Sequence, residues 1–499
     1  AAVAANGYEC ASIGRSILER EGSAVDAAIA TLFCEGLGCA QCMGLGGGFL
    51  ATVYDASSGR VRVLNARERA PAATRQDMYT NASSTVGGLA IAVPGELRGY
   101  GALHREYGRL PWGDLIRPTA ELCRQGHRVS QYMGRVLNWF LFSSELYVNP
   151  ETKEVWNEGD LIREPTLART LDVIAEEGPE AIHNGSLTEA LVRDIRNFGG
   201  IITEDDLRNY QCPIAVPLSE DHTLYSVPLP GSGSVLAFIL NMLHDWVGFG
   251  TDVPYGTNLY WHRVVETFKY AYAKRTGLGD PSRSNLPYDI RELKKTDKAT
   301  FSDWRHYGAL FEGADDHGTA HVVVVAPDGS VVSVTSTINY IWGSQRRSTS
   351  LGIMLNNEMD DFAIPHRESA YGMPPSPANM LAPGLQPLSS MVPSIVLSRN
   401  GTADLVIGAA GGTKITTQVA LVRYNFILIS ISNKYLQNTL ELYRVYFQDV
   451  LASLRTRGHA TTALGPTAGF AAMVGAARDA DGLLIAQTDR RRIGSVDGF

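Results

Sequence analysis

Residues 315–337 read DDHGTAHVVVVAPDGSVVSVTST, two β-branched runs on either side of a turn. Such runs around Pro327-Asp328-Gly329 predict a β-hairpin. Thr319 and Thr337 lie equally far from Asp328, so a symmetric register sets them across from each other at the open end of the hairpin. A one-residue shift would turn one of them to the other face. Taken alone, the hairpin favours an ordinary structural role for both threonines.

The composition is that of a large globular protein. The chain has 499 residues, of which 44% are hydrophobic and 19% are charged, with a net charge of −8. A chain of this length can bury a sizeable core, and this composition leaves no room for extensive disorder. Acidic and basic residues are mixed along the chain without a basic stripe, which argues against a nucleic-acid partner.

No stretch reaches the roughly 18 uninterrupted apolar residues that a membrane-spanning helix requires. Residues 419–432 come nearest, but Arg423, Tyr424 and Asn425 interrupt them. The chain opens at Ala1 with neither an initiator methionine nor a charged leader, so we expect a processed or truncated product.

Cysteines and glycosylation sequons favour an oxidising, secretory environment. The cysteines are Cys10, Cys34, Cys39, Cys42, Cys123 and Cys212, and the Asn-x-Ser/Thr sequons begin at Asn81, Asn184 and Asn400. Cys39-x-x-Cys42 has no second ligand pair at zinc-finger spacing. We therefore interpret it as structural and expect no metal site there.

The N-terminal region predicts helices that lead into a strand. Apolar residues recur at helical spacing over residues 12–38 and are interrupted at Gly22. Two helices are expected, the second capped by Ser23 with Asp26 three residues on. Residues 49–55 predict a strand, and helices that lead into strands fit an α/β layered body.

The middle of the chain is mainly helical in pattern. Residues 97–275 are interpreted as scaffold, and residues 199–207 predict a turn leading into a capped helix. Residues 267–279 form a helix with basic residues that include Arg275, which we interpret as a solvated face.

Glycine-rich loops raise the possibility of nucleotide binding, which the details exclude. Gly44-x-Gly46 is followed by Phe49 where a third glycine is needed. Gly412-Thr413-Lys414 lacks the Gly-Lys-Ser/Thr ending of a phosphate loop. The remaining interpretation is close backbone approach, for packing or for a ligand.

The chemistry of amide cleavage gives the two threonines a second interpretation. An enzyme that cleaves an amide without a metal needs a nucleophile, a base and donors for the oxyanion. A threonine at a chain terminus is better placed than one in mid-chain, because its own α-amino group, with a pKa of about 8, can take the hydroxyl proton. Gly318 precedes Thr319, and glycine lets a hydroxyl approach the preceding carbonyl.

Short motifs occur in a fixed order between residue 1 and about residue 420. They are Gly22-Ser23-Ala24-Val25-Asp26-Ala27-Ala28, Met43-Gly44-Leu45-Gly46-Gly47-Gly48, Asn65-Ala66-Arg67-Glu68, Val93-Pro94-Gly95-Glu96, Gly318-Thr319-Ala320-His321, Thr335-Ser336-Thr337-Ile338-Asn339, Asn356-Asn357-Glu358-Met359-Asp360-Asp361, Pro387-Leu388-Ser389-Ser390-Met391 and Gly408-Ala409-Ala410-Gly411-Gly412-Thr413. In this order the chain resembles the γ-glutamyltransferases (glutathione hydrolases), a family of N-terminal-nucleophile hydrolases. The resemblance is closest to the animal, membrane-anchored branch.

The resemblance implies an α+β fold, the four-layer αββα sandwich of the N-terminal-nucleophile hydrolases. It also implies a zymogen that cuts itself between Gly318 and Thr319. Residues 1–318 would form the large subunit and residues 319–499 the small catalytic subunit, within one composite globular body. No cofactor is expected.

The resemblance also assigns the catalytic residues. Thr319 matches the nucleophile and Thr337 the residue whose hydroxyl orients it. Gly411 and Gly412 match the oxyanion hole, where glycine leaves backbone N–H groups unobstructed.

The substrate residues follow in the same way, because a γ-glutamyl donor presents an α-ammonium and an α-carboxylate. The residues that match the ammonium site are Asn339, Glu358 and Asp361, and those that match the carboxylate site are Arg67, Ser389 and Ser390. Each residue alone has an ordinary structural interpretation, but together and in order they favour a substrate site.

The remaining implications concern partners and location. Cys10 and Cys34 match a disulfide pair of the animal members. Expected partners are glutathione and its S-conjugates as donors and amino acids or dipeptides as acceptors, with no nucleic acid. We expect the extracellular face of the plasma membrane or secretion, with any membrane anchor outside this chain.

The sequence departs from the family in three places. It is short between Asp280 and Asp315, it differs after Val422, and Asn339 is followed by Tyr340-Ile341-Trp342. Two alternatives stay open. One is a sister amidase such as a cephalosporin or glutaryl acylase, against which the ammonium-binding set argues. The other is a catalytically silent homologue acting as an ectodomain, which the divergent residues 423–458 motivate.

Overall fold

The computed structural model describes most of the chain. The described residues are 1–139, 145–215, 217–220, 224–247, 252–283, 304–309, 311, 318–365, 374–431, 449–461, 471–479 and 481–499. Asp315, Asp316 and His317, which open the quoted stretch, lie outside them, as do residues 432–448 of the divergent region.

A seven-stranded sheet holds the hairpin near its centre, in the order β17-β1-β9-β10-β2-β3-β6. These strands span Ser495–Gly498, Ala2–Ala5, Ala320–Val325, Val331–Thr337, Gly48–Asp55, Arg60–Ala66 and Ile214–Ala215. β9 and β10 pair from Val325 with Val331 to Ala320 with Ser336. The predicted register about Asp328 is therefore confirmed, and its next step sets Thr319 beside Thr337.

A six-stranded sheet faces the first, in the order β16-β15-β14-β13-β8-β7. Its strands span Leu484–Thr488, Ala472–Arg478, Ala403–Ala410, Ser394–Leu397, Leu224–Ser226 and Leu218–Glu220. β14 lies against the hairpin, where Ser333 Oγ donates to the Ile407 carbonyl oxygen at 3.1 Å. A Cβ on Gly408 would lie 2.1 Å from the His321 ring, so only glycine lets the sheets approach this closely.

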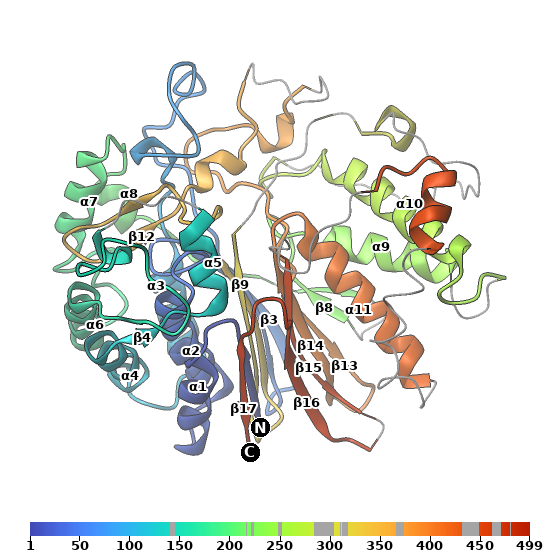
Figure 1. The fold of residues 1–499 in the computed structure, drawn as a ribbon, viewed down its shortest axis with the longest axis horizontal. Coiled ribbons are helices and arrows are strands. Elements are labelled where there is room, and N and C mark those ends of the chain that lie inside the picture. The colour runs from blue at the N-terminus through green and yellow to red at the C-terminus, as the bar shows by residue number, and fades with distance from the viewer. Residues whose placement is uncertain are drawn as a thin grey trace.

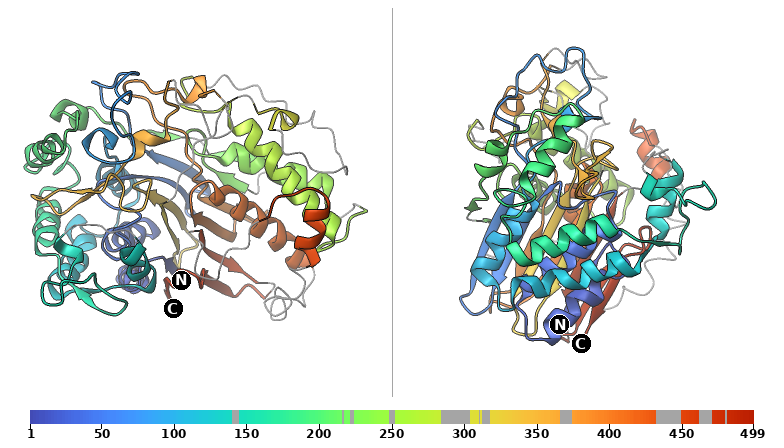
Figure 2. Two further views of the ribbon diagram at one scale, coloured as in Figure 1. Left: turned by 45° about the horizontal axis from the view of Figure 1, so that its top comes forward. Right: turned by 90° about the vertical axis from the view of Figure 1, so that its left-hand side faces the viewer.

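Helices cover the outer faces of both sheets (Figures 1 and 2). On the first sheet lie α1 (Cys10–Glu19), α2 (Ala24–Gly38) and α3 (Glu96–Tyr107), with α4 (Trp112–Gln125) and α6 (Pro165–Glu177) packed behind α2. On the second lie α9 (Gly233–Trp246), α10 (Asn258–Arg275) and α11 (Lys414–Ile431). Smaller elements are α5 (Gln131–Trp139), α7 (Thr188–Asn197), α8 (Glu204–Arg208) and the short strands β4 (His127–Arg128), β5 (Leu161–Ile162), β11 (Arg346–Arg347) and β12 (Met354–Leu355). The predicted αββα sandwich is confirmed.

Local sequence predictions in the first helices are also confirmed. Ser23 Oγ accepts from the Asp26 N–H at 3.0 Å, and the Ser23 N–H donates to Asp26 Oδ2 at 2.9 Å, which completes the capping box of α2. Cys10 and Cys34 form the implied disulfide, which joins α1 to α2. The strand predicted over residues 49–55 is β2, and α8 begins after a second capping box at Thr203.

The interpretation of residues 267–279 as a solvated face is wrong for Arg275, whose exposed fraction is 2%. The physical reason is that α10 is covered on more than one side, so its polar residues His262, Glu266 and Thr267 are buried as well. The mainly helical pattern of residues 97–275 also missed β7 and β8, which extend the second sheet.

The divergent C-terminal region still supplies its strands. β15 and β16 complete one edge of the second sheet, and β17 pairs with β1 in the first. Figure 1 shows the N- and C-termini side by side, where β1 and β17 pair in the first sheet. Within the described ranges, no helix is both long and apolar enough to cross a membrane.

Candidate active site

The bond between Gly318 and Thr319 lies at the start of β9, in buried surroundings. Thr319 has an exposed fraction of 2%, and its Oγ1 donates to the Gly318 carbonyl oxygen. Thr337 Oγ1 donates to the same oxygen at 2.7 Å and accepts from the Asn339 N–H at 2.8 Å. Both hydroxyls therefore converge on the carbonyl that a self-cleavage reaction would attack.

Close backbone packing fixes the positions of Gly318 and Thr337, the two residues of this contact. A Cβ on Gly318 would lie 2.5 Å from the Asn339 carbonyl oxygen and 2.8 Å from the Tyr340 carbonyl carbon. A Cβ on Gly47 would lie 2.1 Å from the Thr337 carbonyl oxygen. The glycine-rich loop thus serves backbone packing beside Thr337, which is one of the two interpretations left open by its sequence.

Arg492 is a residue of this region that the sequence did not reveal. Its exposed fraction is 2%, its Nη1 donates to the Thr319 carbonyl oxygen at 2.8 Å, and its guanidinium lies 4.4 Å from the centre of the Tyr132 ring. It belongs to the run Arg490-Arg491-Arg492, and nothing in that run distinguishes the buried arginine from its neighbours.

Arg67 and two predicted ammonium-site residues form one buried cluster. The guanidinium donates to Glu358 Oε1 and, at 2.6 Å, to Asp361 Oδ2, and all three side chains are about 1% exposed. Glu358 and Asp361 share a 3-10 turn, as their spacing predicted. Glu68 lies 3.6 Å from the guanidinium, and burial raises the pKa of its carboxyl to about 8. Carboxyl oxygens therefore gather around this guanidinium, and oxygens of this kind suit an ammonium ligand.

Asn339 adds an acceptor to this cluster. Its backbone has φ +71°, its Nδ2 donates to the Asn357 carbonyl oxygen at 3.1 Å, and its Oδ1 is buried with no hydrogen-bond donor. A buried carbonyl oxygen without a donor is costly, so a ligand N–H would satisfy it. Because Asn357 precedes Glu358, this bond also ties the Thr337–Asn339 turn to the acidic turn.

The Ser389-Ser390 loop lies against Arg67 on another side. Arg67 Nε and Nη2 contact the carbonyl oxygens of Pro387 and Leu388, each at 3.4 Å. Ser389 and Ser390 are 1% and 0% exposed, and their loop is held by backbone bonds such as Ser389 N–H to the Pro230 carbonyl oxygen at 2.8 Å. The structure thus bonds Arg67 directly to Glu358 and Asp361, and it brings Asn339, Ser389 and Ser390 to this cluster through bonds of their neighbouring residues Asn357 and Leu388.

Gly411 and Gly412 form the junction between β14 and α11. Both have positive φ, +120° and +62°, and a Cβ on Gly411 would lie 2.5 Å from the Ala471 Cα. Since β14 packs on the hairpin with Gly408 against His321, its end lies at the same end of the sandwich as Thr319. Backbone N–H groups at a helix N-terminus suit an oxyanion.

The aromatic residues after Asn339 have separate roles. Tyr340 OH donates to Asp360 Oδ2 at 2.8 Å, beside the acidic turn. Trp342 is 1% exposed and packs 4.5 Å from the Tyr147 ring, within an apolar cluster. Only Tyr340 therefore borders the predicted substrate site.

A second polar cluster joins α10 to the segment at His459. His262 Nδ1 and His459 Nε2 lie 2.8 Å apart, and Glu266 completes a set that could hold a metal ion. The Lys269 ammonium lies 3.2 Å from Glu266 and 3.4 Å from His459 Nδ1, so a positive charge already occupies this place. We interpret the cluster as a hydrogen-bonded link between the two segments.

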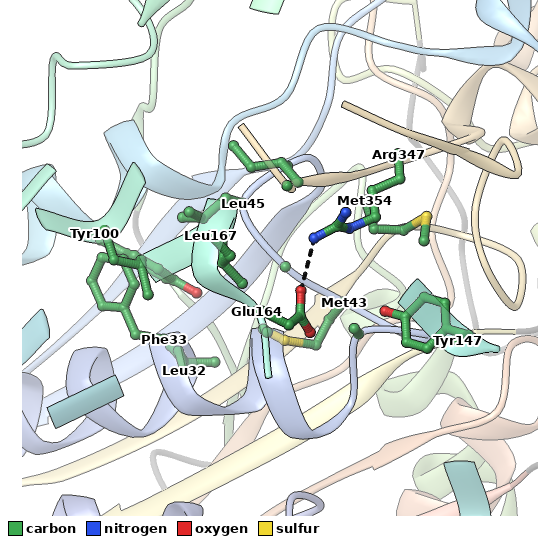
Figure 3. A pocket seen from close by; sticks show the side chains of 16 residues that line it. Leu32, Phe33, Met43, Leu45, Tyr100, Tyr147, Glu164, Leu167, Arg347 and Met354 are labelled. Carbon is green, nitrogen blue, oxygen red and sulfur yellow. Dashed lines mark hydrogen bonds and ion pairs between the residues drawn. The ribbon is translucent and has the colours of Figure 1, made fainter. Parts of the chain in front are cut away.

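Two cavities are candidate routes by which a substrate could reach the site. Figure 3 shows one lined by Met43, Tyr147 and Met354, into which Arg347 points to meet Glu164 at 3.0 Å. Its volume of about 30 Å³ suits one or two waters, not glutathione. A wider surface hollow of about 880 Å³ is lined by residues 76–85, and Ser84 in its wall donates to Asp360. This hollow therefore borders the acidic turn.

Comparisons with known proteins place these observations in context. A family model described as Gamma-glutamyltranspeptidase matches residues 10–499. The chain is 40% identical to Scoloptoxin SSD14 of Scolopendra dehaani, over 100% of this chain and 92% of the relative. It is 38% identical to the Glutathione hydrolase 5 proenzyme of Mus musculus, over 84% of this chain and 77% of the relative.

The fold is also similar to a solved structure. The crystal structure of cephalosporin acylase from Bacillus halodurans matches with a TM-score of 0.81 at 21% identity, over 100% of this chain and 95% of that chain. At this identity, the likeness concerns the fold.

Proposed function

The chain belongs to the γ-glutamyltranspeptidase family, enzymes that hydrolyse glutathione and transfer its γ-glutamyl group, and on that premise we propose that Thr319 is its nucleophile. One observation carries the proposal: the hydroxyls of Thr319 and Thr337 both donate to the Gly318 carbonyl oxygen. An N-terminal-nucleophile hydrolase needs this convergence at the bond whose cleavage frees its nucleophile.

Self-cleavage starts with Thr319 Oγ1 adding to the Gly318 carbonyl carbon. The hydroxyl proton passes to the Thr319 nitrogen, the C–N bond breaks, and an ester joins Gly318 to the threonine side chain. Water then cleaves the ester, which leaves a Gly318 carboxylate and a free Thr319 amino group. The Thr337 hydroxyl, which already donates to the carbonyl oxygen, stabilises the negative charge that develops there.

Turnover repeats this chemistry on the substrate. The free amino group of Thr319 takes the hydroxyl proton as Oγ1 attacks the γ-glutamyl carbonyl carbon, and the backbone N–H groups of Gly411 and Gly412 stabilise the oxyanion. The amine leaves with the proton, and a γ-glutamyl ester remains on Thr319. Water resolves this ester in hydrolysis, and the amino group of an amino acid or dipeptide resolves it in transfer.

The buried cluster recognises the head of the donor. The α-ammonium binds Asn339 Oδ1 with Glu358 and Asp361, and the α-carboxylate binds Ser389 and Ser390 with Arg67. Support comes from the carboxyl groups gathered around Arg67 and from the unsatisfied Asn339 oxygen. We infer that glutathione and its S-conjugates are the donors.

The alternatives are less well supported. Likeness to a cephalosporin acylase concerns the fold, and a glutaryl group has no ammonium to offer to Glu358 and Asp361. The silent-homologue hypothesis was motivated by the divergent residues 423–458; the strands that follow them, β15, β16 and β17, are all paired. The family membership supports an active enzyme.

We further infer that the protein works on the extracellular face of the plasma membrane or after secretion. The Cys10–Cys34 disulfide supports an oxidising compartment, and Asn81, Asn184 and Asn400 are all exposed, as glycan acceptors must be. The two subunits, residues 1–318 and 319–499, would stay together, because β9 and β10 of the small subunit lie between strands of the large one.

Intact mass and N-terminal sequencing of the protein secreted from animal cells test these proposals. We expect a fragment that begins at Thr319, added glycan mass at the three sequons, and release of p-nitroaniline from γ-glutamyl-p-nitroanilide, faster with glycylglycine. Thr319→Ala should leave a single inactive chain, whereas the exposed control Thr152→Ala should be cut and active. An uncut wild type, or a cut and active Thr319→Ala variant, would exclude Thr319 as the nucleophile.

A further inference from the structure

Arg275, the last residue of α10, is a buried cation beside the predicted carboxylate site. Its exposed fraction is 2%. Its Nη2 donates to Ser390 Oγ at 3.0 Å, and its Nε contacts Ser232 Oγ at 3.5 Å. In the part of the chain that the structure describes, no carboxylate lies within ion-pair distance of this guanidinium.

A buried guanidinium without a carboxylate partner destabilises the folded state. A charge removed from water is destabilising unless an opposite charge or a full set of hydrogen bonds compensates it. Two serine hydroxyls satisfy only part of a guanidinium that carries five N–H donors. An anionic ligand in contact with the serines would supply the missing compensation.

The hydrogen bonds also fix the direction in which the serines can donate. Arginine has no acceptor, so Ser390 Oγ must accept from Arg275, and the single proton of Ser390 is directed elsewhere. Ser232 Oγ in turn donates to the Ser389 carbonyl oxygen at 2.6 Å. Arg275 therefore contacts both serines of the pair, one directly and the other through Ser232.

The charges around the site also favour a carboxylate beside Arg275. Arg67 is shared between Glu358 and Asp361, so a second cation beside the serines would strengthen the binding of a carboxylate. A donor head brings one positive and one negative charge. Arg275 places a second guanidinium on the serine side of the site, where the negative end of this head is expected.

We propose that Arg275 is a positioning residue of the α-carboxylate site: it aims the Ser390 hydroxyl at the carboxylate of the γ-glutamyl donor and places a positive charge behind it. This inference rests on the proposed function and deepens it. Arg275 does not touch the reacting carbonyl, so it acts on binding of the donor and not on the chemical step.

Steady-state kinetics with two donors test the proposal on the self-cleaved enzyme. One donor is γ-glutamyl-p-nitroanilide, and the other is 4-aminobutyryl-p-nitroanilide, which lacks only the α-carboxylate. We expect Arg275→Met to raise KM for the γ-glutamyl donor at least 10-fold, on the order of one or two lost charge-assisted hydrogen bonds, with kcat within about threefold. For the 4-aminobutyryl donor, kcat/KM should stay within about twofold. Lys274→Met, a half-buried neighbour on the same helix, is the matched control.

A double-mutant cycle with Ser390→Ala separates positioning from packing. In the Ser390→Ala background, Arg275→Met should have less than half of its effect on KM, because the hydroxyl that it aims is gone. Equal losses of kcat/KM for both donors, or an undiminished effect without the Ser390 hydroxyl, would make Arg275 purely structural and overturn the proposal. An uncut wild type that turns over no γ-glutamyl amide would instead overturn the proposed function, and this inference with it.

Discussion

At the scale of single residues, the Gly318–Thr319 bond is held by backbone atoms of the neighbouring turn. The Asn339 and Tyr340 carbonyl groups fill the space in which a Gly318 side chain would lie. The Thr337 hydroxyl can reach the Gly318 carbonyl oxygen because the chain approaches that closely. The requirement for glycine is therefore one of space as well as of chemistry.

Gly318→Ala should greatly slow self-cleavage. Its Cβ would lie 2.5 Å from the Asn339 carbonyl oxygen, so the chain must shift and the contact with Thr337 lengthens. The uncut fraction, followed by intact mass over time after synthesis, measures the effect, and we expect at least a 100-fold loss, about 3 kcal/mol of barrier. Gly475→Ala is the control, because its Cβ would lie 3.3 Å from its nearest neighbour. Cleavage of Gly318→Ala at the wild-type rate would contradict this account.

At the scale of elements, one carboxylate, that of Asp26, both caps the start of α2 and holds the loop at residues 109–110. Asp26 is fully buried, and its Oδ2 accepts from three backbone N–H groups: Ser23 at 2.9 Å, Arg109 at 2.8 Å and Leu110 at 3.2 Å. The capping box that the sequence predicted thus also anchors the loop that leads into α4.

Asp26→Ala should lower the free energy of unfolding by about 2–3 kcal/mol, because one buried and two part-buried backbone N–H groups lose their acceptor at about 1 kcal/mol each. Asp206→Ala, at the same position of the α8 capping box, should cost only about 1 kcal/mol, since its bond from the Ala72 N–H is exposed and water can replace the half-exposed carboxylate. Urea unfolding in the Thr319→Ala background keeps the chain uncut and allows direct comparison. Equal losses for the two variants would disprove the anchoring role.

At the scale of the whole molecule, the sequence predicted what local patterns determine. The β-branched runs and the turn gave the hairpin and its register, and Ser23 with Asp26 gave a helix start. The predicted site residues could be named because the resemblance supplied the motifs. Arg492 and Arg275 could not be predicted, because a buried arginine has the same local pattern as a solvated one. Their roles arise from contacts with Thr319 and Ser390, which lie far away in sequence.

The pH dependence of stability is a further property of the whole molecule, because buried acids and buried histidines act in opposite directions. Burial lowers the pKa of His321 to about 3, so protonation of this residue in the unfolded chain destabilises the fold as the pH falls below about 6.5. Burial raises the pKa of Glu96 to about 8. The folded state then keeps a proton that the unfolded chain loses near pH 4.5, so this contribution to stability is full below pH 4.5 and is lost as the pH rises to 8.

Glu96→Gln isolates the second effect. Glu96 Oε1 accepts from Tyr100 OH and, at 2.8 Å, from Ser336 Oγ, and a glutamine oxygen can accept both bonds while mimicking the protonated acid. The stability of the variant relative to the wild type should rise between pH 4.5 and 8, by at most about 1.4 kcal/mol per pH unit, and level off above pH 8. Urea midpoints at half-unit pH steps, with the exposed Glu106→Gln as control on the same helix, measure this difference. A difference that stays constant from pH 5 to 8 would mean that Glu96 is ionised in the folded protein, and the Ser336 end of β10, next to Thr337, would then lie beside a negative charge.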